Sequence, residues 1–235
     1  MKAWALSGAP KQLWPPKQLW PKDLNQQLLT AKKSGDLIIG IDRGALLLKE
    51  MGMKIDVAEG DFDSLQKNEL RLIEQNVRDI RYSIPEKDLT DTEMAIRCAF
   101  IDYHVSYLTL FGATGGRLDH FLSNLFMVLK PEFNQFAEKI ELIDQQNSIR
   151  FYNCGHHVIK KLSTYKYFGV IPLTAVKNLK IAGAKYNLND FNGVNPISFS
   201  SNEFLLNVNQ FGLSFEKGVV AVIQSRDVNR FQNIK

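Results

Sequence analysis

The sequence predicts an α/β N-terminal domain with a mostly parallel sheet, followed by an all-β C-terminal sandwich domain. Two observations support this. Through about residue 145, short apolar runs alternate with segments of helical period, the pattern of βαβ units. After residue 146, short runs rich in β-branched and aromatic residues come between Gly, Asn and Ser, without a convincing long helical pattern. The predicted domains are 1–146 and 147–235.

In the first domain, strands are predicted where compact apolar runs end in Gly, Pro or an acidic residue. These runs are 3–6, 36–42, 55–59, 80–84, 105–111 and 141–144. The helices are predicted from apolar residues three or four apart and from capping residues at either end. They are 24–33, 44–51, 66–76, about 118–129, and one that Thr90 or Asp91 caps and that runs to about residue 100.

A tandem repeat interrupts the start of the first domain. The hexapeptide PKQLWP occurs twice in tandem, at 10–15 and 16–21, and its four prolines predict an extended surface loop. In the second domain, the predicted strands are 149–152, 165–173, 179–182, 197–199, 204–208, 213–215 and 219–224.

Composition excludes several classes of protein. The net charge of +4 over 235 residues is too mild to indicate a nucleic-acid-binding protein, which usually needs clustered Lys and Arg. Two cysteines without a CxxC exclude a disulfide framework and a thiolate zinc site. Apolar runs are too short for a membrane span or a signal peptide. We therefore expect a cytoplasmic protein that binds neither membrane nor nucleic acid.

The stretch 55–64 is the most informative in the chain, because a predicted strand ends in Gly60-Asp61-Phe62-Asp63-Ser64. In an extended chain, Asp61 and Asp63 point to one side while Phe62 turns into the protein. Two adjacent like charges favour a cation or a shared proton between them. Mg²⁺ takes carboxylate and phosphate oxygens, so the pair indicates a metal site for a phosphorylated substrate. A solvated turn is the alternative.

The stretch 86–93 concentrates four acids, one base and two hydroxyls. At a helix entrance, Asp88 and Asp91 share a face, three residues apart. A capped helix with acids at its positive end explains Asp91 and Glu93, but leaves Lys87 and Asp88 without a reason. Both interpretations remain open for this stretch alone.

A glycine-rich loop, 112–116, separates a predicted strand from a predicted helix. Backbone amides of Gly112, Gly115 and Gly116 can cradle phosphate there, helped by the helix dipole. Arg117 adds a guanidinium suited to phosphate oxygens. A dinucleotide-binding loop is the competing interpretation, although the third glycine of that fingerprint is missing.

These stretches follow different strands but are expected to meet. In a parallel sheet, ligands bind beyond the carboxyl ends of the strands. The residues that follow predicted strands in this way are Asp42, Asp61, Asp63, Asp88, Asp91 and the Gly112 loop. Their shared position is stronger evidence for a site than any single motif.

The ordered blocks resemble the thiamine pyrophosphokinase family over nearly the whole chain. The resemblance rests on 42–45, 60–64, 87–93, 112–120 with Asn124, 201–203 and 218–227. It implies an α/β catalytic domain that binds ATP and Mg²⁺, a β-sandwich that binds thiamine, and a homodimer with active sites between subunits. It also implies transfer of a pyrophosphoryl group from ATP to thiamine, with release of AMP.

The resemblance also implies residue roles. Asp42, Asp61, Asp63 and Asp91 match positions that gather Mg²⁺ and the polyphosphate, and Asp61, Asp63, Asp88 and Asp91 are the expected catalytic residues. The expected ATP contacts are Arg43, Lys87, Thr90, Gly112, Gly115, Gly116 and Arg117. Asp119, Ser201 and Asn202 are expected to contact thiamine. Two alternatives remain: a different Mg²⁺-dependent phosphoryl or nucleotidyl transferase, and a nucleotide-sensing module without turnover.

Overall fold

The computed structural model describes residues 1–8, 20–83, 89–163 and 165–227. Most of the PKQLWP repeat, together with Lys87 and Asp88, lies outside these ranges. The chain divides into two compact units, Met1–Gln145 and Gln146–Lys235. Each unit is described separately below.

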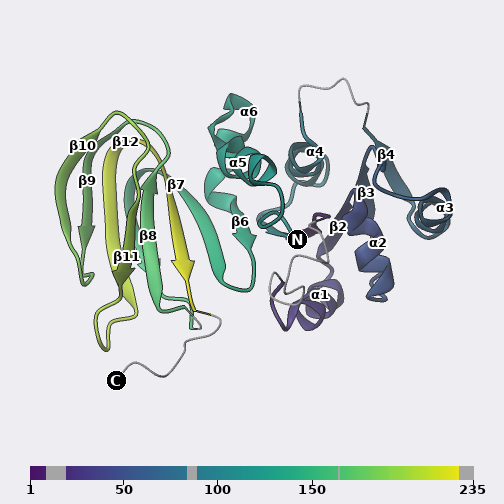
Figure 1. Ribbon diagram of the computed structural model, residues 1–235, viewed down its shortest axis with the longest axis horizontal. Coiled ribbons are helices and arrows are strands. Elements are labelled where there is room, and N and C mark those ends of the chain that lie inside the picture. The colour runs from purple at the N-terminus through teal and green to yellow at the C-terminus, as the bar shows by residue number, and fades with distance from the viewer. Residues whose placement is uncertain (9–19, 84–88, 164, 228–235) are drawn as a thin grey trace. The chain divides into compact units, whose positions relative to one another are not determined.

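The first unit is built on a six-stranded parallel sheet (Figure 1). Its spatial order is β6-β5-β1-β2-β3-β4. The strands are β1 (Ala3–Leu6), β2 (Leu37–Ile41), β3 (Val57–Gly60), β4 (Asp79–Tyr82), β5 (Leu108–Phe111) and β6 (Ile140–Ile143). The chain starts near the middle of the sheet, proceeds to one edge and returns to the other side of β1. Topology therefore reverses between β1 and β5, where parallel sheets bind ligands.

Helices cover both faces of this sheet, with α1 and α2 on one side and α4 to α6 on the other (Figure 1). The α-helices are α1 (Leu24–Lys33), α2 (Arg43–Glu50), α3 (Lys67–Asn76), α4 (Asp91–Arg97), α5 (Leu118–Phe126) and α6 (Pro131–Asn134). One π-helical turn, η1 (Cys98–Asp102), extends α4, and two 3₁₀ turns, η2 (Met127–Leu129) and η3 (Ala137–Lys139), flank α6.

Helix α2 approaches the sheet so closely that only glycine fits at position 44. A Cβ on Gly44 would lie 1.9 Å from the carbonyl oxygen of Leu6, at the end of β1. A Cβ on Gly40, in β2, would lie 2.4 Å from Cα of Ala45. These contacts bring the start of α2, and Asp42 just before it, against the ends of the central strands.

The buried core of the first unit joins residues from both kinds of element. Leu6, Ile38, Ala58 and Phe111 come from four strands, and they pack in one cluster with helical residues such as Leu28. Burying these apolar side chains supplies the main driving force for this layer arrangement. The cluster also contains Phe62, from the loop that carries the paired aspartates.

The second unit is a β-sandwich whose two sheets share two long strands. These are β7 (Asn147–Lys160) and β12 (Gln210–Ser225), paired antiparallel along nearly their whole length. One half of β12 also pairs with β9 (Val176–Ala182), which pairs with β10 (Leu188–Gly193). The other half pairs with β8 (Tyr167–Pro172), which pairs with β11 (Phe199–Glu203). Side chains of β8, β9 and β12 meet in one core cluster.

The predicted strand boundaries are partly wrong in this unit. The separate strands predicted at 213–215 and 219–224 are one strand, because a bulge with Gly218 at φ 104° lets β12 continue. A Cβ on Gly218 would lie 2.4 Å from the carbonyl oxygen of Ala175, so glycine is required there. The strand predicted at 204–208 is also wrong: only Phe204 forms a bridge, with Ala184, before a turn. Strand β10 was not predicted.

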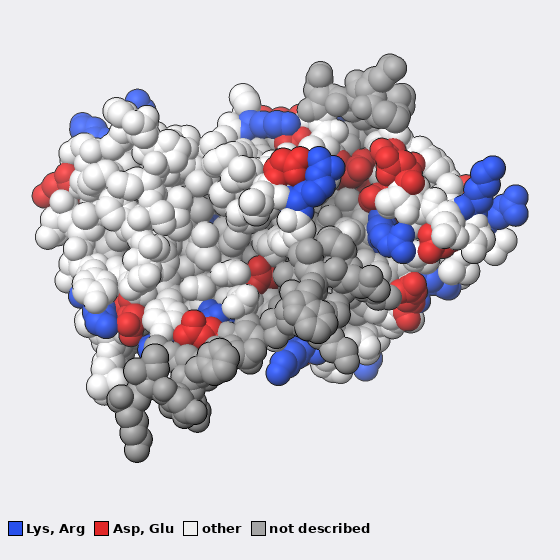
Figure 2. Space-filling view, viewed as in Figure 1, with Lys and Arg blue, Asp and Glu red and all other residues white. Residues whose placement is uncertain are grey.

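The surface carries charges of both signs. On the face shown in Figure 2, Lys and Arg lie among Asp and Glu. Across the described ranges, every helix is too short or too polar to cross a lipid bilayer.

Candidate active site

Three carboxylates meet at the carboxyl ends of β2 and β3. Asp42 follows β2, and Asp61 and Asp63 follow the neighbouring parallel strand β3. One oxygen from each carboxylate lies within 4.8 Å of the other two. Parallel pairing of the strands therefore brings together acids that are about twenty residues apart in the sequence.

The loop after β3 points its acids outward by a backbone turn. Phe62 adopts a left-handed φ of 56°, is buried in the core, and packs edge-to-face on Tyr82 at a centroid distance of 5.6 Å. The backbone N–H of Asp63 donates to Oδ1 of Asp61 at 3.0 Å. Phe62 turns inward as predicted, but through a left-handed turn and not through the alternation of an extended strand.

Asp42 sits in a strained backbone conformation next to this loop. Its φ is 49° and its ψ is −125°, an uncommon combination for a residue other than glycine. A Cβ on Gly60 would lie 3.0 Å from Cα of Asp42, so the glycine allows the two strand ends to approach. Strain of this kind persists only where the surrounding structure imposes it.

The carboxylate of Asp42 is incompletely satisfied. Its Oδ2 accepts a hydrogen bond from Oγ of Ser64 at 3.0 Å. Its Oδ1 is buried, and no hydrogen-bond partner for it occurs among the described residues. Burial raises the pKa of Asp42; the bond from Ser64 acts in the opposite direction, and the charges of Asp91 and Asp61 raise it further.

This donor set fits a hard divalent cation. Three carboxylates, one with an unpartnered oxygen, repel one another unless positive charge or a proton lies between them. Mg²⁺ prefers oxygen ligands and is commonly held by one or two carboxylates together with substrate phosphates. Asp42, Asp61 and Asp63 would hold it here.

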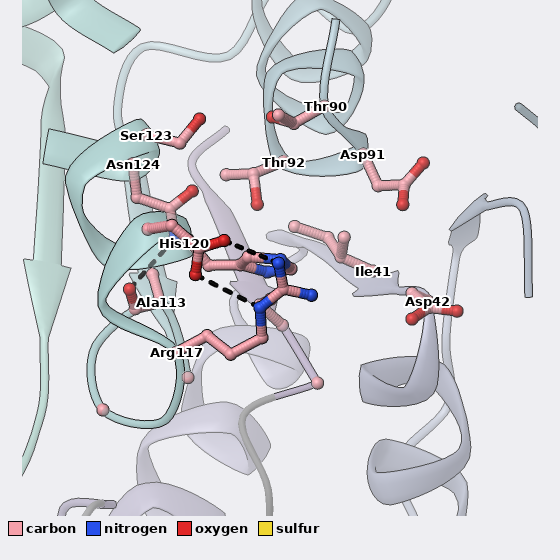
Figure 3. A pocket seen from close by; sticks show the side chains of 15 residues that line it. Ile41, Asp42, Thr90, Asp91, Thr92, Ala113, Arg117, His120, Ser123 and Asn124 are labelled. Atoms are coloured by element: carbon pink, nitrogen blue, oxygen red, sulfur yellow. Dashed lines mark hydrogen bonds and ion pairs between the residues drawn. The ribbon is translucent and has the colours of Figure 1, made fainter. Parts of the chain in front are cut away.

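A cavity of about 620 Å³ opens beside the carboxylates. It lies within the first unit, among residues from the ends of β1, β2 and β5 and the starts of α4 and α5. Figure 3 shows Asp42 and Asp91 on one side, Ser123 and Asn124 on the other, and Arg117 reaching between them. This volume is within the range of small-molecule binding sites, roughly 300–1,000 Å³.

The glycine-rich loop forms one wall of the cavity. Gly112 and Gly115 line it, with φ values of 68° and 81°, and a Cβ on Gly112 would lie 2.4 Å from the carbonyl oxygen of Ser7. Oγ1 of Thr114 donates to Oδ2 of Asp144 at 2.7 Å in the interior. Nδ2 of Asn124 donates to the carbonyl of Ala113 at 3.0 Å. These side chains hold the loop in one conformation.

Arg117 and Asp119 form an exposed ion pair at the N-terminus of helix α5. Nε and Nη2 of Arg117 lie 3.1 and 2.6 Å from the two carboxylate oxygens of Asp119. The hydrogen bond from Arg117 lowers the pKa of Asp119, and the carboxylate raises the pKa of Arg117. Because exposed pairs of this kind are weak, an arriving phosphate group can take the place of Asp119 on the guanidinium.

Thr90 and Asp91 line the cavity from the start of α4. Thr90 is the N-cap, and its Oγ1 accepts from the backbone N–H of Glu93 at 3.3 Å. Oδ1 of Asp91 accepts from Oγ of Ser83, just after β4, at 2.7 Å. Asp91 is not part of the three-carboxylate group, but its charge acts on Asp42.

The other predicted site residues have varied positions. Arg43 donates to the carbonyl of Ser64 at 3.0 Å and lies 3.8 Å from Glu69, so it supports the aspartate loop and is not among the cavity-lining residues. Gly116, at φ 73°, belongs to the glycine-rich loop but is likewise not among them. Lys87 and Asp88 lie outside the described residues.

Ser201 and Asn202 belong to β11 in the second unit. Ser201 is exposed and has a left-handed φ of 60°. Asn202 is only 4% exposed, and its side-chain amide bonds both the N–H and the carbonyl of Tyr186, at 3.0 and 2.7 Å. The amide of Asn202 therefore holds the segment that carries Tyr186.

Several residues that shape the site had no predicted role. Ser64 and Ser83 bond Asp42 and Asp91, and the cavity also contains Ser7, Gly8, Ile41, Thr92, His120 and Ser123. The strand-end rule applied to the aspartates would have found Ser7, which follows the predicted strand 3–6, but not Ser83, which lies inside the predicted strand 80–84. Ser7 was not predicted because a serine after a strand is an ordinary turn residue.

Comparisons with known proteins agree with the geometry. The model of the thiamin pyrophosphokinase catalytic domain matches residues 28–142, and that of the thiamin pyrophosphokinase vitamin B1 binding domain matches residues 156–220. The thiamine pyrophosphokinase of Bacillus subtilis (strain 168) is 35% identical over 193 residues, which are 81% of this chain and 88% of that protein.

Solved structures show the same fold. The thiamin pyrophosphokinase family protein from Enterococcus faecalis superposes with a TM-score of 0.85 at 34% identity, covering 97% of this chain and 100% of that one. The thiamine pyrophosphokinase structure from Bacillus subtilis superposes with a TM-score of 0.79 at 31% identity, with the same coverage.

Proposed function

This chain belongs to the thiamin pyrophosphokinase family, and on that premise we propose that it transfers the pyrophosphoryl group of ATP to the hydroxyl group of thiamine, giving thiamine pyrophosphate and AMP. The observation that carries the proposal is the three-carboxylate group, in which one Asp42 oxygen has no partner among the described residues, beside a cavity lined by a glycine-rich loop and Arg117. Acids suited to a cation and amides suited to phosphate occur together.

The proposed reaction moves one group between two oxygens. The hydroxyl oxygen of thiamine forms a bond to the β-phosphorus of ATP, and the bond from that phosphorus to the α–β bridging oxygen breaks. The electron pair leaves with AMP, and the hydroxyl proton passes to a carboxylate of the cavity wall, where Asp42 and Asp91 both lie. Such a transfer requires in-line positioning and neutralisation of phosphate charge.

Different residues are proposed to hold the metal and to bind the phosphates. When bound, Mg²⁺ would supply Lewis-acid charge to the phosphate oxygens. Asp42, Asp61 and Asp63 would hold it, with Asp91 on the same side of the cavity as Asp42. Arg117 would exchange Asp119 for a phosphate oxygen, while the Gly112 and Gly115 amides and Thr90 line the phosphate path. Arg43, Lys87 and Gly116 stay proposed ATP contacts and Asp88 a proposed catalytic residue, with Lys87 and Asp88 outside the described residues.

We assign thiamine binding to the second unit. Asp119, in the first unit, stays a separate proposed thiamine contact. The vitamin B1 binding domain model, which covers residues 156–220, supports this assignment because its match contains Ser201 and Asn202. Ser201 is exposed and available for a direct contact. Asn202 acts through the backbone of Tyr186, which its amide holds.

Product analysis tests the proposal. Purified protein incubated with ATP, Mg²⁺ and thiamine is expected to yield AMP and thiamine pyrophosphate in equal amounts, identified by mass. Release of ADP, or of inorganic pyrophosphate with a nucleotidylated product, would instead indicate another transferase. Tight ATP binding without thiamine-dependent AMP release would indicate a nucleotide-sensing module.

We also propose that the protein is a homodimer with active sites at the subunit interface. Helix α5 presents Leu118, Leu122 and Phe126 one turn apart, with exposed fractions of 75%, 45% and 40%. Such a stripe favours burial against a second copy. The same helix carries Asp119 and Ser123 at the cavity, so a partner on the stripe would border the site.

Sedimentation is expected to give about twice the chain mass of 26.8 kDa. Leu122→Glu would place a charge within the stripe and is expected to shift the protein toward the monomer. Leu72→Glu, on α3 and similarly exposed, is the matched control and should leave the mass unchanged. A wild-type protein that sediments as a monomer at micromolar concentration would refute the dimer.

A further inference from the structure

Glu93 is a carboxylate enclosed behind the wall of the cavity. Its side chain is 2% exposed, although it belongs to α4, whose N-cap Thr90 and first residue Asp91 line the cavity. Oε2 of Glu93 accepts a hydrogen bond from the backbone N–H of Thr90 at 2.9 Å. Oγ1 of Thr90 accepts in return from the N–H of Glu93 at 3.3 Å. This reciprocal pair is a capping box, which sets the start of the helix.

Lys130 supplies the positive charge for this carboxylate. Its Nζ lies 2.7 Å from Oε1 and 2.8 Å from Oε2 of Glu93. Lys130 comes from the connection between η2 and α6, 37 residues further along the chain. A buried carboxylate is costly unless it is paired, and removal of one partner leaves the other charge uncompensated. Without Lys130, the buried charge of Glu93 would favour displacement of this side chain toward water.

Such a displacement would disturb the cavity wall. The oxygen that lies near Lys130 also accepts the Thr90 N–H, so displacement of Glu93 releases the cap. Asp91 follows Thr90 directly, and its Oδ1 accepts a hydrogen bond from Ser83. A loosened first turn would therefore allow the Asp91 carboxylate to shift relative to Asp42.

We propose that Lys130 is a positioning residue. Through Glu93 and the Thr90 cap, it holds Asp91 in place for a magnesium-bound nucleoside triphosphate. This inference rests on the proposed function for the identity of the ligand, but not for the positioning itself. Lys130, just before α6, therefore influences the cavity-lining start of α4 through the buried carboxylate of Glu93.

The chain provides a matched control on the same two segments. Arg97, at the end of α4, lies 3.4 Å from Glu132 of α6. Both side chains are exposed, at 54% and 41%, and neither belongs to the capping box. Loss of this pair also removes a charge link between α4 and α6, but leaves the Thr90 cap intact. Exposed pairs contribute little to stability.

The first measurement is hydrogen exchange, which does not depend on activity. In Lys130→Met, the amides of residues 90–93 are expected to exchange faster than in the wild type, whereas Arg97→Met should leave them protected. The second is calorimetric binding of Mg²⁺ with α,β-methylene-ATP, whose α–β linkage cannot be cleaved in the proposed reaction. We expect about tenfold weaker binding for Lys130→Met and wild-type binding for Arg97→Met.

Two rescues separate positioning from general damage. Lys130→Arg keeps the charge and should bind the analogue as the wild type does. Glu93→Gln combined with Lys130→Met leaves a neutral acceptor for the Thr90 N–H, and should restore both protection and binding. Should Lys130→Met fail to fold, this double variant carries the comparison: wild-type binding supports the proposal, and tenfold weaker binding overturns it.

Unchanged analogue binding in a folded Lys130→Met protein with faster exchange would also overturn the proposal, because Lys130 would then support only the helix. A different result would refute the proposed reaction. A wild-type protein that binds the analogue but releases no AMP with thiamine refutes the reaction, while the exchange and binding measurements still decide the role of Lys130.

Discussion

Replacing either Asp61 or Asp63 with Asn is expected to lower kcat for thiamine-dependent AMP release by about 100-fold, with the fold intact. Each change removes one negative charge from the group whose oxygens lie within 4.8 Å of one another. An amide binds a hard cation more weakly than a carboxylate does, so the metal would be held less firmly and in altered geometry.

Stability should not follow activity in these variants. Asp63 is exposed, and Asn at position 61 keeps an oxygen that can accept the Asp63 N–H. The melting temperature without metal is therefore expected to stay the same or rise, because repulsion within the group is reduced. Higher Mg²⁺ concentration should recover part of the lost rate.

Asp23→Asn is the matched control for this experiment. Asp23 is an exposed acid of the same unit, and its side chain makes no capping hydrogen bond at α1. It should turn over thiamine at the wild-type rate. Wild-type turnover by folded Asp61→Asn and Asp63→Asn proteins would contradict the metal assignment.

Replacing Asp42 with Asn is expected to change activity and stability in opposite directions. Activity should fall by about 100-fold, since the oxygen with no partner among the described residues would no longer carry charge for a cation. The metal-free protein should nevertheless become more stable at pH 7, because Asn carries no charge that burial penalises. Asn tolerates the left-handed φ of 49° as Asp does and can still accept the Ser64 hydroxyl.

The pH dependence follows from the direction of the pKa shift. Burial, the largest cause, raises the pKa of Asp42 in the folded protein above its usual value of 3.8. The folded state therefore binds this proton more tightly than the unfolded state. The contribution of protonated Asp42 to the free energy of unfolding is complete below about pH 4. It is lost as the pH rises through the raised pKa of the folded state.

Thermal unfolding with and without Mg²⁺ checks this prediction. The advantage of Asp42→Asn should be present at pH 7 without metal and should disappear below pH 4, where wild-type Asp42 is protonated. Addition of Mg²⁺ should raise the melting temperature of the wild type more than that of the variant. A variant less stable than the wild type at pH 7 in chelator would show that the buried charge carries no cost.

The site was predictable where strand order alone places residues. Asp42, Asp61 and Asp63 each follow an apolar run, and parallel strands end at the same edge of a sheet, so their meeting required no knowledge of packing. The inward position of Phe62 was also predicted, although from the alternation of side chains in an extended strand. Its left-handed backbone was not, because a non-glycine residue adopts that conformation only when its surroundings impose it.

The second unit shows where prediction from the sequence was weakest. Residues 216–218 resemble a turn, but the backbone passes through them as a bulge within β12. The reason lies in the long β7 partner, whose hydrogen bonds continue on both sides of the bulge. Asn202 is a similar case. Its residue type indicates a polar contact, but only the fold reveals that its side-chain amide is hydrogen-bonded to the backbone of Tyr186.

The sequence by itself determined the α/β and all-β halves, the family, and the acids and glycines that follow strands. Only the tertiary structure decided that one oxygen of Asp42 has no partner among the described residues, that buried Glu93 pairs with Lys130, and that Arg43 serves the aspartate loop instead of the cavity wall. Periodicity and strand ends are local properties of the chain. Burial and pairing depend on segments tens of residues apart, and these become neighbours only after the chain has folded.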